Sequence, residues 1–121
     1  MTTTTPVPNP EPGEVYWVDL DPAIGPEQAG RRPVMILSGM QLHAVSLRCL
    51  VCPITSNRSP WPTKIILPEG GVVDGAILLD QVRMIDRKAR RMRYIGKLPY
   101  EVVDLTAEAL SAFLGRTRIK P

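Results

Sequence analysis

The sequence predicts a mainly β domain, a small and strongly bent antiparallel barrel followed by one C-terminal helix. Five or six short β-prone segments follow one another, separated by turns rich in Pro and Gly. They do not alternate with helical patterns, which disfavours a parallel sheet. One amphipathic pattern comes last, and the length of 121 residues fits a single domain.

The turn signals set the bounds of the expected strands. These strands occupy residues 14–20, 33–38, 47–55, 63–67, 76–85 and 94–98, with residues 76–85 forming one long strand or two that bend near Asp80. Pro33 suits the start of its strand, because no N–H is needed there. Residues 39–45 are compatible with one helical turn. A long loop (23–32), a polar loop (56–62) and a basic connection (87–93) join the strands.

The helix is expected over residues 100–114, between Pro99 and Gly115. Its apolar face is formed by Val102, Val103, Ala109, Leu110, Phe113 and Leu114. Residues 1–12, rich in Thr and Pro, are expected to form an extended, mobile tail, and residues 116–121 a basic one. One domain would then span residues 13–115.

The composition limits the class of protein. A hydrophobic content of 44% argues against disorder. No apolar run approaches the roughly 20 residues that cross a bilayer, so no membrane partner is expected. The N-terminus lacks the charged and apolar regions of a secretory signal. A net charge of +3 permits a polyanionic partner without requiring one.

Cys49 and Cys52 have the C-x-x-C spacing of redox and zinc sites. Zinc needs four ligands, and the chain has one histidine and no second cysteine pair. Both cysteines fall in an expected buried strand, where residues three apart point to opposite faces. We therefore expect two buried, reduced thiols and, without a signal peptide, a cytoplasmic protein.

Several kinds of catalysis lack their residues. His43 is the only histidine, so no histidine pair is available, and we expect it to be structural or exposed. No phosphate-binding glycine motif or nucleophile elbow occurs. Asp19, Asp21, Asp80 and Asp86 lack the spacing of a metal site. We expect neither a metal nor a cofactor.

Five segments in order resemble the MazF/PemK toxin family of prokaryotic toxin–antitoxin systems. They are GEVYWVDLDP, GPEQAGRRPVMIL, CPITS, DGAILLDQVRMID and GKLPYEVVDLTAEALSAFLG, and together they span residues 13–115. The resemblance implies an SH3-like barrel of the CcdB/PemK type that forms a homodimer. It also implies a sequence-specific, metal-independent endoribonuclease that inhibits translation and growth by cutting single-stranded mRNA. Attack by the 2′-hydroxyl would leave 2′,3′-cyclic phosphate and 5′-hydroxyl ends, and a cognate MazE-like antitoxin would block the site.

The resemblance gives three catalytic candidates. Arg32 matches the family's arginine before proline, and a fixed, forked cation stabilises the charge of a phosphoryl transition state. Thr55 matches the family's threonine at the end of the third strand. Its hydroxyl can bond a phosphate oxygen, or it caps its own strand. Glu27 matches the family's loop glutamate and is either the general base for the 2′-hydroxyl or a solvated carboxylate.

The other candidates are expected to bind RNA: Gln28, Arg31, Ser56, Asn57, Trp61, Asp80, Gln81 and Arg83. Trp61 would stack on an unpaired base, or it anchors a loop between two prolines. Gln81 would read a base edge, and Asp80 is either an acid or base or a structural hydrogen-bonding group. The basic run 87–93 would track the RNA backbone, or it is a solvated hairpin.

Two other functions fit the same fold. A CcdB-like toxin would bind gyrase and catalyse nothing, but such toxins typically make contact through a tryptophan-containing tail. This chain ends in RTRIKP, without aromatic residues. A non-catalytic RNA- or protein-binding barrel would keep the basic surface and need neither Arg32 nor Thr55.

Overall fold

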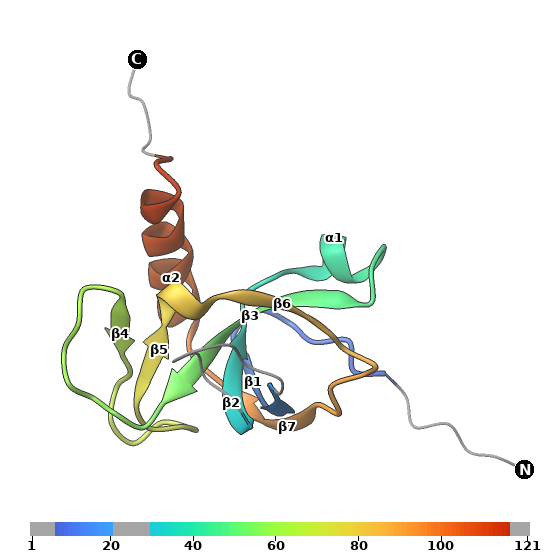
Figure 1. Cartoon of the computed structure of the whole chain (residues 1–121), viewed down its shortest axis with the longest axis horizontal. Helices are drawn as coiled ribbons and strands as arrows, with labels where there is room; N and C mark the ends of the chain where they lie inside the picture. The colour runs from blue at the N-terminus through green and yellow to red at the C-terminus, as the bar shows by residue number, and fades with distance from the viewer. Residues whose placement is uncertain (1–6, 21–29, 117–121) are drawn as a thin grey trace, which may run out of the picture.

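The computed structural model describes residues 7–20 and 30–116. Its elements are β1 (Glu14–Asp19), β2 (Arg31–Ile36), α1 (Met40–His43), β3 (Arg48–Thr55), β4 (Lys64–Ile66), β5 (Ala76–Leu78), the 3-10 turn η1 (Leu79–Gln81), β6 (Arg83–Asp86), β7 (Arg93–Lys97) and α2 (Tyr100–Phe113). Every strand pairing is antiparallel, and α2 follows the last strand, which confirms the predicted fold class (Figure 1). The bend expected near Asp80 is η1. None of the described helices is long and apolar enough to span a membrane.

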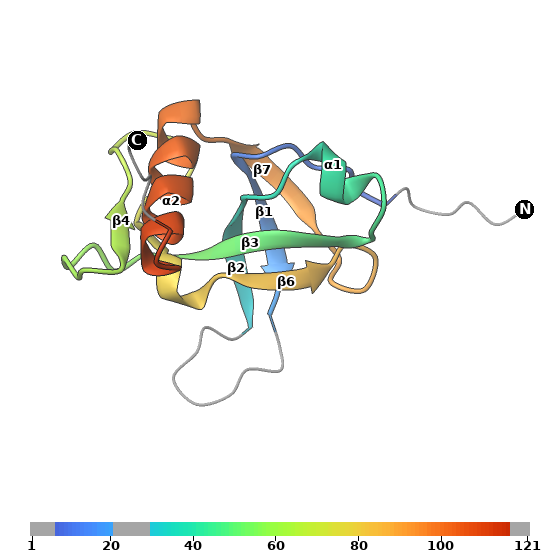
Figure 2. The same cartoon turned by 90° about the horizontal axis from the view of Figure 1, so that it is seen from above.

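The strands form one sheet around β3. Its order is β4-β5-β3-β2-β1-β7, and β6 pairs with β3 beside β5. Along β3, the first half pairs with β6 and the last two residues pair with β5. No described pairing joins β6 to β7, so the barrel is open between them. Figures 1 and 2 show α2 at the end of the sheet near β4 and β5, and α1 at the opposite end.

Two packed clusters form the core, because successive strand residues point to opposite faces. One contains Val15, Met35, Cys52, Ile54, Leu67, Ile77, Leu79, Leu98, Val102 and Val103. The other contains Tyr16, Val18, Leu20, Val34, Ile36, Cys49, Val51 and Ile85. The two cysteines are free and buried, and they lie in different clusters, as their spacing predicts. Burial raises the pKa of Cys49 to about 11 and that of Cys52 to about 12, so both thiols stay protonated at neutral pH.

The apolar face predicted for α2 is only partly correct. Val102 and Val103 are buried, but Phe113 and Leu114 are 58% and 68% exposed. The last turns of α2 extend beyond the strands (Figure 1), and the periodicity of a helix does not show where its partner surface ends. Thr106 is fully buried within the packed half and donates from Oγ1 to the Val102 carbonyl at 2.7 Å.

Residues 7–12 belong to the expected mobile tail, yet they pack against the barrel. The Pro8 carbonyl accepts a hydrogen bond from Arg87 Nη1 at 2.7 Å, and the Pro10 carbonyl accepts one from His43 Nδ1 at 2.9 Å. Pro10 is buried. The two proline carbonyls accept hydrogen bonds from buried donors of the barrel, and these hydrogen bonds hold the segment in place.

Candidate functional site

A hollow of about 290 Å³ lies where the ends of β1, β2 and β3 meet the loop before β5. We call it the arginine hollow, and it is lined by Trp17, Arg31, Arg32, Pro33, Ile54, Ser56, Val73 and Asp74. It brings together three predicted site residues, Arg31, Arg32 and Ser56, from two strand ends that adjoin in the sheet. Trp17, Val73 and Asp74 were not predicted.

Arg31 and Arg32 are the first residues of β2, whereas the sequence predicts that they belong to the preceding loop. Arg31 lies opposite Asp19 and Arg32 lies opposite Val18. Pro33 pairs with Trp17 on β1 only, because the pairing with β3 begins at the next residue, so the missing N–H breaks no ladder there. Strand pairing therefore fixes the backbone that carries both guanidinium groups, and both side chains remain exposed.

Thr55 ends β3, between the lining residues Ile54 and Ser56. It is half-buried, and its Oγ1 accepts a hydrogen bond from the Asn57 N–H at 3.2 Å. This is the strand-capping bond that the sequence allowed, and it uses the oxygen as an acceptor only. The hydroxyl hydrogen can still be donated to a phosphate oxygen.

Gly75 lets the loop before β5 press against this strand end. It has a φ of +124°, and a Cβ there would collide with the Thr55 carbonyl oxygen and lie 3.2 Å from the Ser56 Cα. Arg58 secures the same contact by donating to Asp74 at 2.8 Å and to the Gly75 carbonyl at 3.4 Å. The contact of this loop with Thr55 depends on the tertiary fold.

Several predicted RNA contacts lie outside the lining of the arginine hollow. Asn57 closes its own loop, because its Oδ1 accepts from the Ser59 N–H at 2.9 Å. Trp61 is 65% exposed in the loop before β4. Asp80 and Gln81 are in η1, and half-buried Arg83 donates to the Leu20 carbonyl at 3.5 Å. These assignments stay predictions.

Glu27 and Gln28 lie outside the described residues. Their predicted roles as general base and RNA ligand therefore rest on the resemblance alone.

The basic run 87–93 divides into a structural and an exposed part. Arg87 is 5% exposed and donates to the carbonyls of Pro8, His43, Ser46 and Leu47. Arg87 therefore cannot track RNA, and the prediction for the whole run is wrong at this residue. The physical reason is that a buried guanidinium needs its donors satisfied, and the surrounding carbonyls do so.

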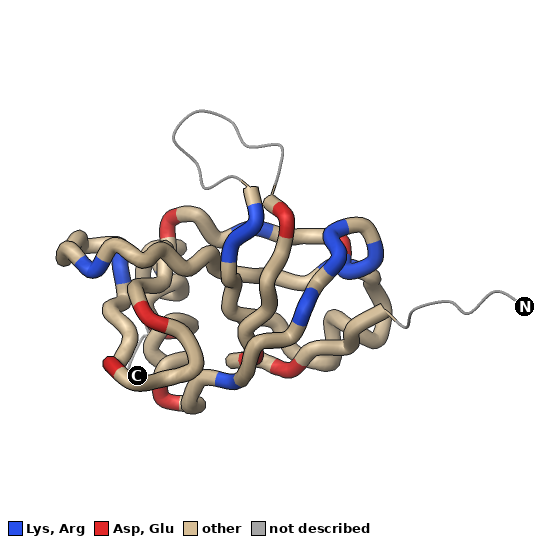
Figure 3. The backbone as a smooth tube through the Cα atoms, turned by 90° about the horizontal axis from the view of Figure 1, so that it is seen from below, with Lys and Arg blue, Asp and Glu red and all other residues tan. Residues whose placement is uncertain are grey.

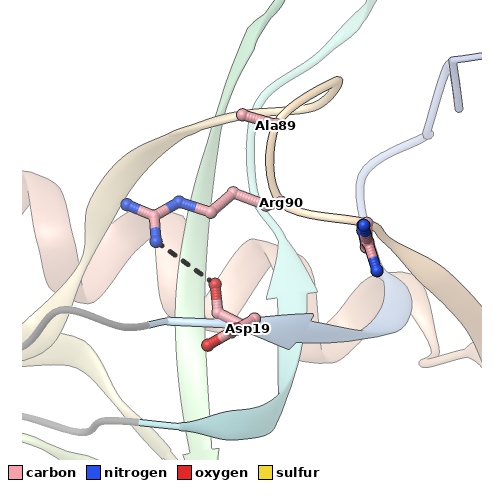
Figure 4. A pocket seen from close by; sticks show the side chains of 4 residues that line it. Asp19, Ala89 and Arg90 are labelled. Atoms are coloured by element: carbon pink, nitrogen blue, oxygen red, sulfur yellow. Dashed lines mark hydrogen bonds between the residues drawn. The ribbon is translucent and has the colours of Figure 1, made fainter.

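Arg90 and Arg91 line a second hollow of about 220 Å³ with Asp19 and Ala89 (Figure 4). Arg90 Nη1 donates to the backbone carbonyl of Asp19 at 3.3 Å. Asp19 is also the β1 partner of Arg31, so this hollow adjoins the start of β2. Figure 3 shows the basic positions of β2 and of the β6–β7 connection on the same side of the molecule.

Comparison with known proteins places this arrangement in a family. Residues 11–114 match the family described as PemK-like, MazF-like toxin of type II toxin–antitoxin system. The endoribonuclease toxin MazF of Escherichia coli K12 is 34% identical over 106 residues, which cover 88% of this chain and 95% of that protein. Endoribonuclease EndoA of Bacillus subtilis 168 is 36% identical over 107 residues, covering 84% and 91%.

Solved structures agree with the sequence matches. The crystal structure of MazF from Deinococcus radiodurans superposes with a TM-score of 0.81 at 32% identity, covering 88% of this chain and 96% of that one. A chain of a MazE–MazF crystal structure from the same organism gives a TM-score of 0.77 at 31% identity, covering 89% of this chain and 97% of that one. The sequence match includes both strand ends of the arginine hollow. The chain belongs to the family of PemK-like, MazF-like toxins of type II toxin–antitoxin systems.

Proposed function

We propose that this chain is the toxin of a type II toxin–antitoxin system and cleaves single-stranded mRNA as an endoribonuclease. The observation that carries the proposal is the arginine hollow, where paired strands hold Arg32 beside the end of β3. Relatives that cover most of this chain are named endoribonucleases, which favours this function over gyrase binding or passive RNA binding. Cleavage of mRNA would take place in the cytoplasm and inhibit translation and growth.

The proposed reaction needs a base, an acid and a stabilised phosphate. The 2′-hydroxyl oxygen attacks the adjacent phosphorus and gives up its proton to a base, for which Glu27 is the candidate. The bond from phosphorus to the 5′-oxygen breaks, and that oxygen takes up a proton. The products are a 2′,3′-cyclic phosphate and a 5′-hydroxyl end.

Arg32 would neutralise the charge that gathers on the phosphate oxygens during this step. A guanidinium remains charged at any working pH and offers donors in a fixed fork, which suits it to charge stabilisation. The Thr55 hydroxyl and Ser56 would bond the same phosphate from the end of β3. The protein thus supplies the positive charge, and the proposed reaction needs no metal.

The proposal includes a homodimer and a MazE-like antitoxin as partners. Solved MazE–MazF structures among the relatives support the antitoxin. An antitoxin segment that covers the arginine hollow would exclude RNA from Arg32. Adding the antitoxin should therefore stop cleavage in proportion to the amount of complex formed.

End analysis of cleaved RNA tests the proposed reaction. Purified protein is incubated with a long, end-labelled RNA in the presence of a chelator, and the fragments are assayed for cyclic phosphate and 5′-hydroxyl ends. Arg32→Ala should strongly reduce the amount of fragments formed in a fixed time, and Arg48→Ala, which changes an exposed arginine at the far end of β3, should not. Inhibited DNA supercoiling without RNA fragments would favour gyrase binding, and binding of RNA without cleavage would favour a passive barrel.

A further inference from the structure

Trp17 is an exposed aromatic residue between buried residues of β1. Its neighbours Tyr16 and Val18 are 7% and 0% exposed, whereas Trp17 is 38% exposed and lines the arginine hollow. Because strand residues alternate between faces, Trp17 lies on the same face as fully buried Val15 and two residues closer to the end of β1. Part of the indole therefore faces the hollow beyond the edge of the core.

The sheet holds Trp17 from both sides. Its Cα partners are Pro33 on β2 and Arg93 on β7, so the indole is the centre of a cross-strand row. Directly opposite residues lie on the same face of a sheet and restrict each other. An aromatic side chain with a fixed backbone and only two rotatable bonds loses little entropy when it binds a flat ligand.

The rest of the arginine hollow offers the chemistry of a nucleotide. Arg31, Arg32 and the Ser56 hydroxyl suit a phosphate, and the side chains of Ile54 and Val73 add apolar walls. Asp74 also lines the hollow, but Arg58 offsets its charge at 2.8 Å. The volume of about 290 Å³ lies just below the range of roughly 300–1,000 Å³ for pockets that bind drug-sized ligands. A single base is smaller than a drug-sized ligand.

We infer that Trp17 is the base-stacking platform of this site and holds the unpaired base next to the phosphate at Arg32. This inference rests on the proposed function and adds a residue that positions the substrate. It also moves the stacking role away from Trp61, which does not line the arginine hollow. Stacking on an aromatic ring tolerates any base, so Trp17 would strengthen binding without itself choosing the sequence.

The chain has only two tryptophans, which makes the inference directly measurable. In a Trp61→Phe variant, Trp17 is the sole source of tryptophan fluorescence. The probe is the single-stranded DNA version of an RNA segment that the wild type cleaves, because it lacks the attacking 2′-hydroxyl. We expect saturable quenching of Trp17 in this variant and little change in the matched Trp17→Phe variant, which reports on Trp61.

Kinetics provide the second readout. Trp17→Ala should raise KM for RNA about 5- to 150-fold, the range for loss of one base stack, with a much smaller change in kcat. Trp17→Phe keeps an aromatic ring and should recover most of the binding. A residue that only fills space in the core would not need an aromatic ring for binding. Thermal unfolding of each variant identifies any loss that comes from misfolding.

The possible failures can be told apart. RNA cleavage with no quenching of Trp17, or with quenching of Trp61 instead, overturns the stacking inference and leaves the proposed function standing. If the wild type cuts no RNA, both the function and the inference fall.

Discussion

Arg31 and Arg32 are chemically identical side chains in consecutive positions of β2, and both line the arginine hollow. We expect Arg32, which matches the family's arginine before proline, to stabilise the developing negative charge. The other would add attraction that acts equally on the ground state and the transition state.

We predict that the two arginines separate kcat from KM. Arg32→Ala should lower kcat about 10²–10³-fold, the usual loss for one transition-state donor. Arg31→Ala should mainly raise KM, because an interaction that is equal in both states affects binding alone. Steady-state kinetics on a short RNA measure both. Equal losses of kcat in the two variants would show that Arg32 has no special role.

Thr55 permits a test with small changes of shape. Thr55→Val removes the hydroxyl at nearly constant volume, and Thr55→Ser keeps the hydroxyl. A hydrogen bond to a charged group contributes about 1.5–3 kcal/mol. Thr55→Val should therefore lower kcat/KM about 10- to 150-fold, whereas Thr55→Ser should retain most of it. Cleavage by Thr55→Val at the wild-type rate would leave Thr55 with only its capping bond to Asn57.

At the residue scale, three of the residues predicted from the sequence, Arg31, Arg32 and Ser56, line the same hollow, whereas neither aromatic candidate role has been tested. Arg32 and Ser56 were predicted because their neighbours in the sequence, Pro33 and the end of β3, belong to a motif. Trp61 was selected from its place in a loop between two prolines, and Trp17 was not selected from the expected strand 14–20. Which part of a strand stays uncovered depends on the loop that packs over it, and no local pattern records that.

Among the elements, the loop before β5 positions the end of β3 through Gly75. Gly75→Ala should destabilise the protein through backbone strain, about 1–3 kcal/mol, and through the collision with the Thr55 carbonyl. Gly70→Ala is the matched control, because Gly70 also has a positive φ but no neighbouring atom within 4 Å of an added Cβ. Urea unfolding should show the larger loss for Gly75→Ala, and only this variant should also lose cleavage. Equal losses of stability would rule out the contact.

His43 joins α1 to the N-terminal segment by a chain of hydrogen bonds. A carbonyl only accepts, so Nδ1 carries the proton that is donated to Pro10, and Nε2 accepts from Ser38 Oγ at 2.7 Å. Ser38 Oγ in turn accepts from the Leu50 N–H at 2.8 Å. Burial, and secondarily the nearby Arg87, lower the pKa of His43 below its ordinary value of about 6.5.

We therefore predict that the protein becomes less stable as the pH falls below about 6.5. There the unfolded chain binds a proton at His43 before the folded protein does, so the free energy of unfolding rises with pH. The stabilisation is complete above the unfolded pKa and is lost as the pH falls toward the lowered folded pKa. Urea unfolding between pH 5 and 8 measures it, with His43→Gln as the control. Because His43 is the only histidine, a wild-type slope that persists in His43→Gln would contradict the prediction.

The elements themselves were largely predictable from the sequence. Alternation and turn residues give the strands, and the bend at Asp80 was foreseen as one of two options. The packing of residues 7–12 was missed, since it depends on Arg87 and His43, which are distant in sequence. The apolar face of α2 was overextended at Phe113 for the same reason, because the end of the sheet is a tertiary property.

At the scale of the whole molecule, a net charge of only +3 conceals an uneven distribution of cations. The arginine hollow and the second hollow adjoin through Asp19, and together they present Arg31, Arg32, Arg90 and Arg91 on one side. Arg87, in the same run as Arg90, is buried and does not contribute to this surface. Total charge therefore predicts RNA attraction less well than the number of exposed cations near the site.

The salt dependence of oligonucleotide binding measures how many phosphates these cations neutralise. Each phosphate neutralised on a single strand contributes about −0.7 to the slope of log K against log salt. Changing Arg90 and Arg91 together to Gln should make that slope less steep by up to about 1.4 and weaken binding of a single-stranded oligonucleotide without selecting among sequences. The control Arg48→Gln, at the far end of β3, should leave the slope unchanged. Arg87→Gln should lower stability instead, because four carbonyls would lose their donor. If the double variant kept the wild-type slope, RNA would have to leave the arginine hollow along a path that avoids the β6–β7 connection.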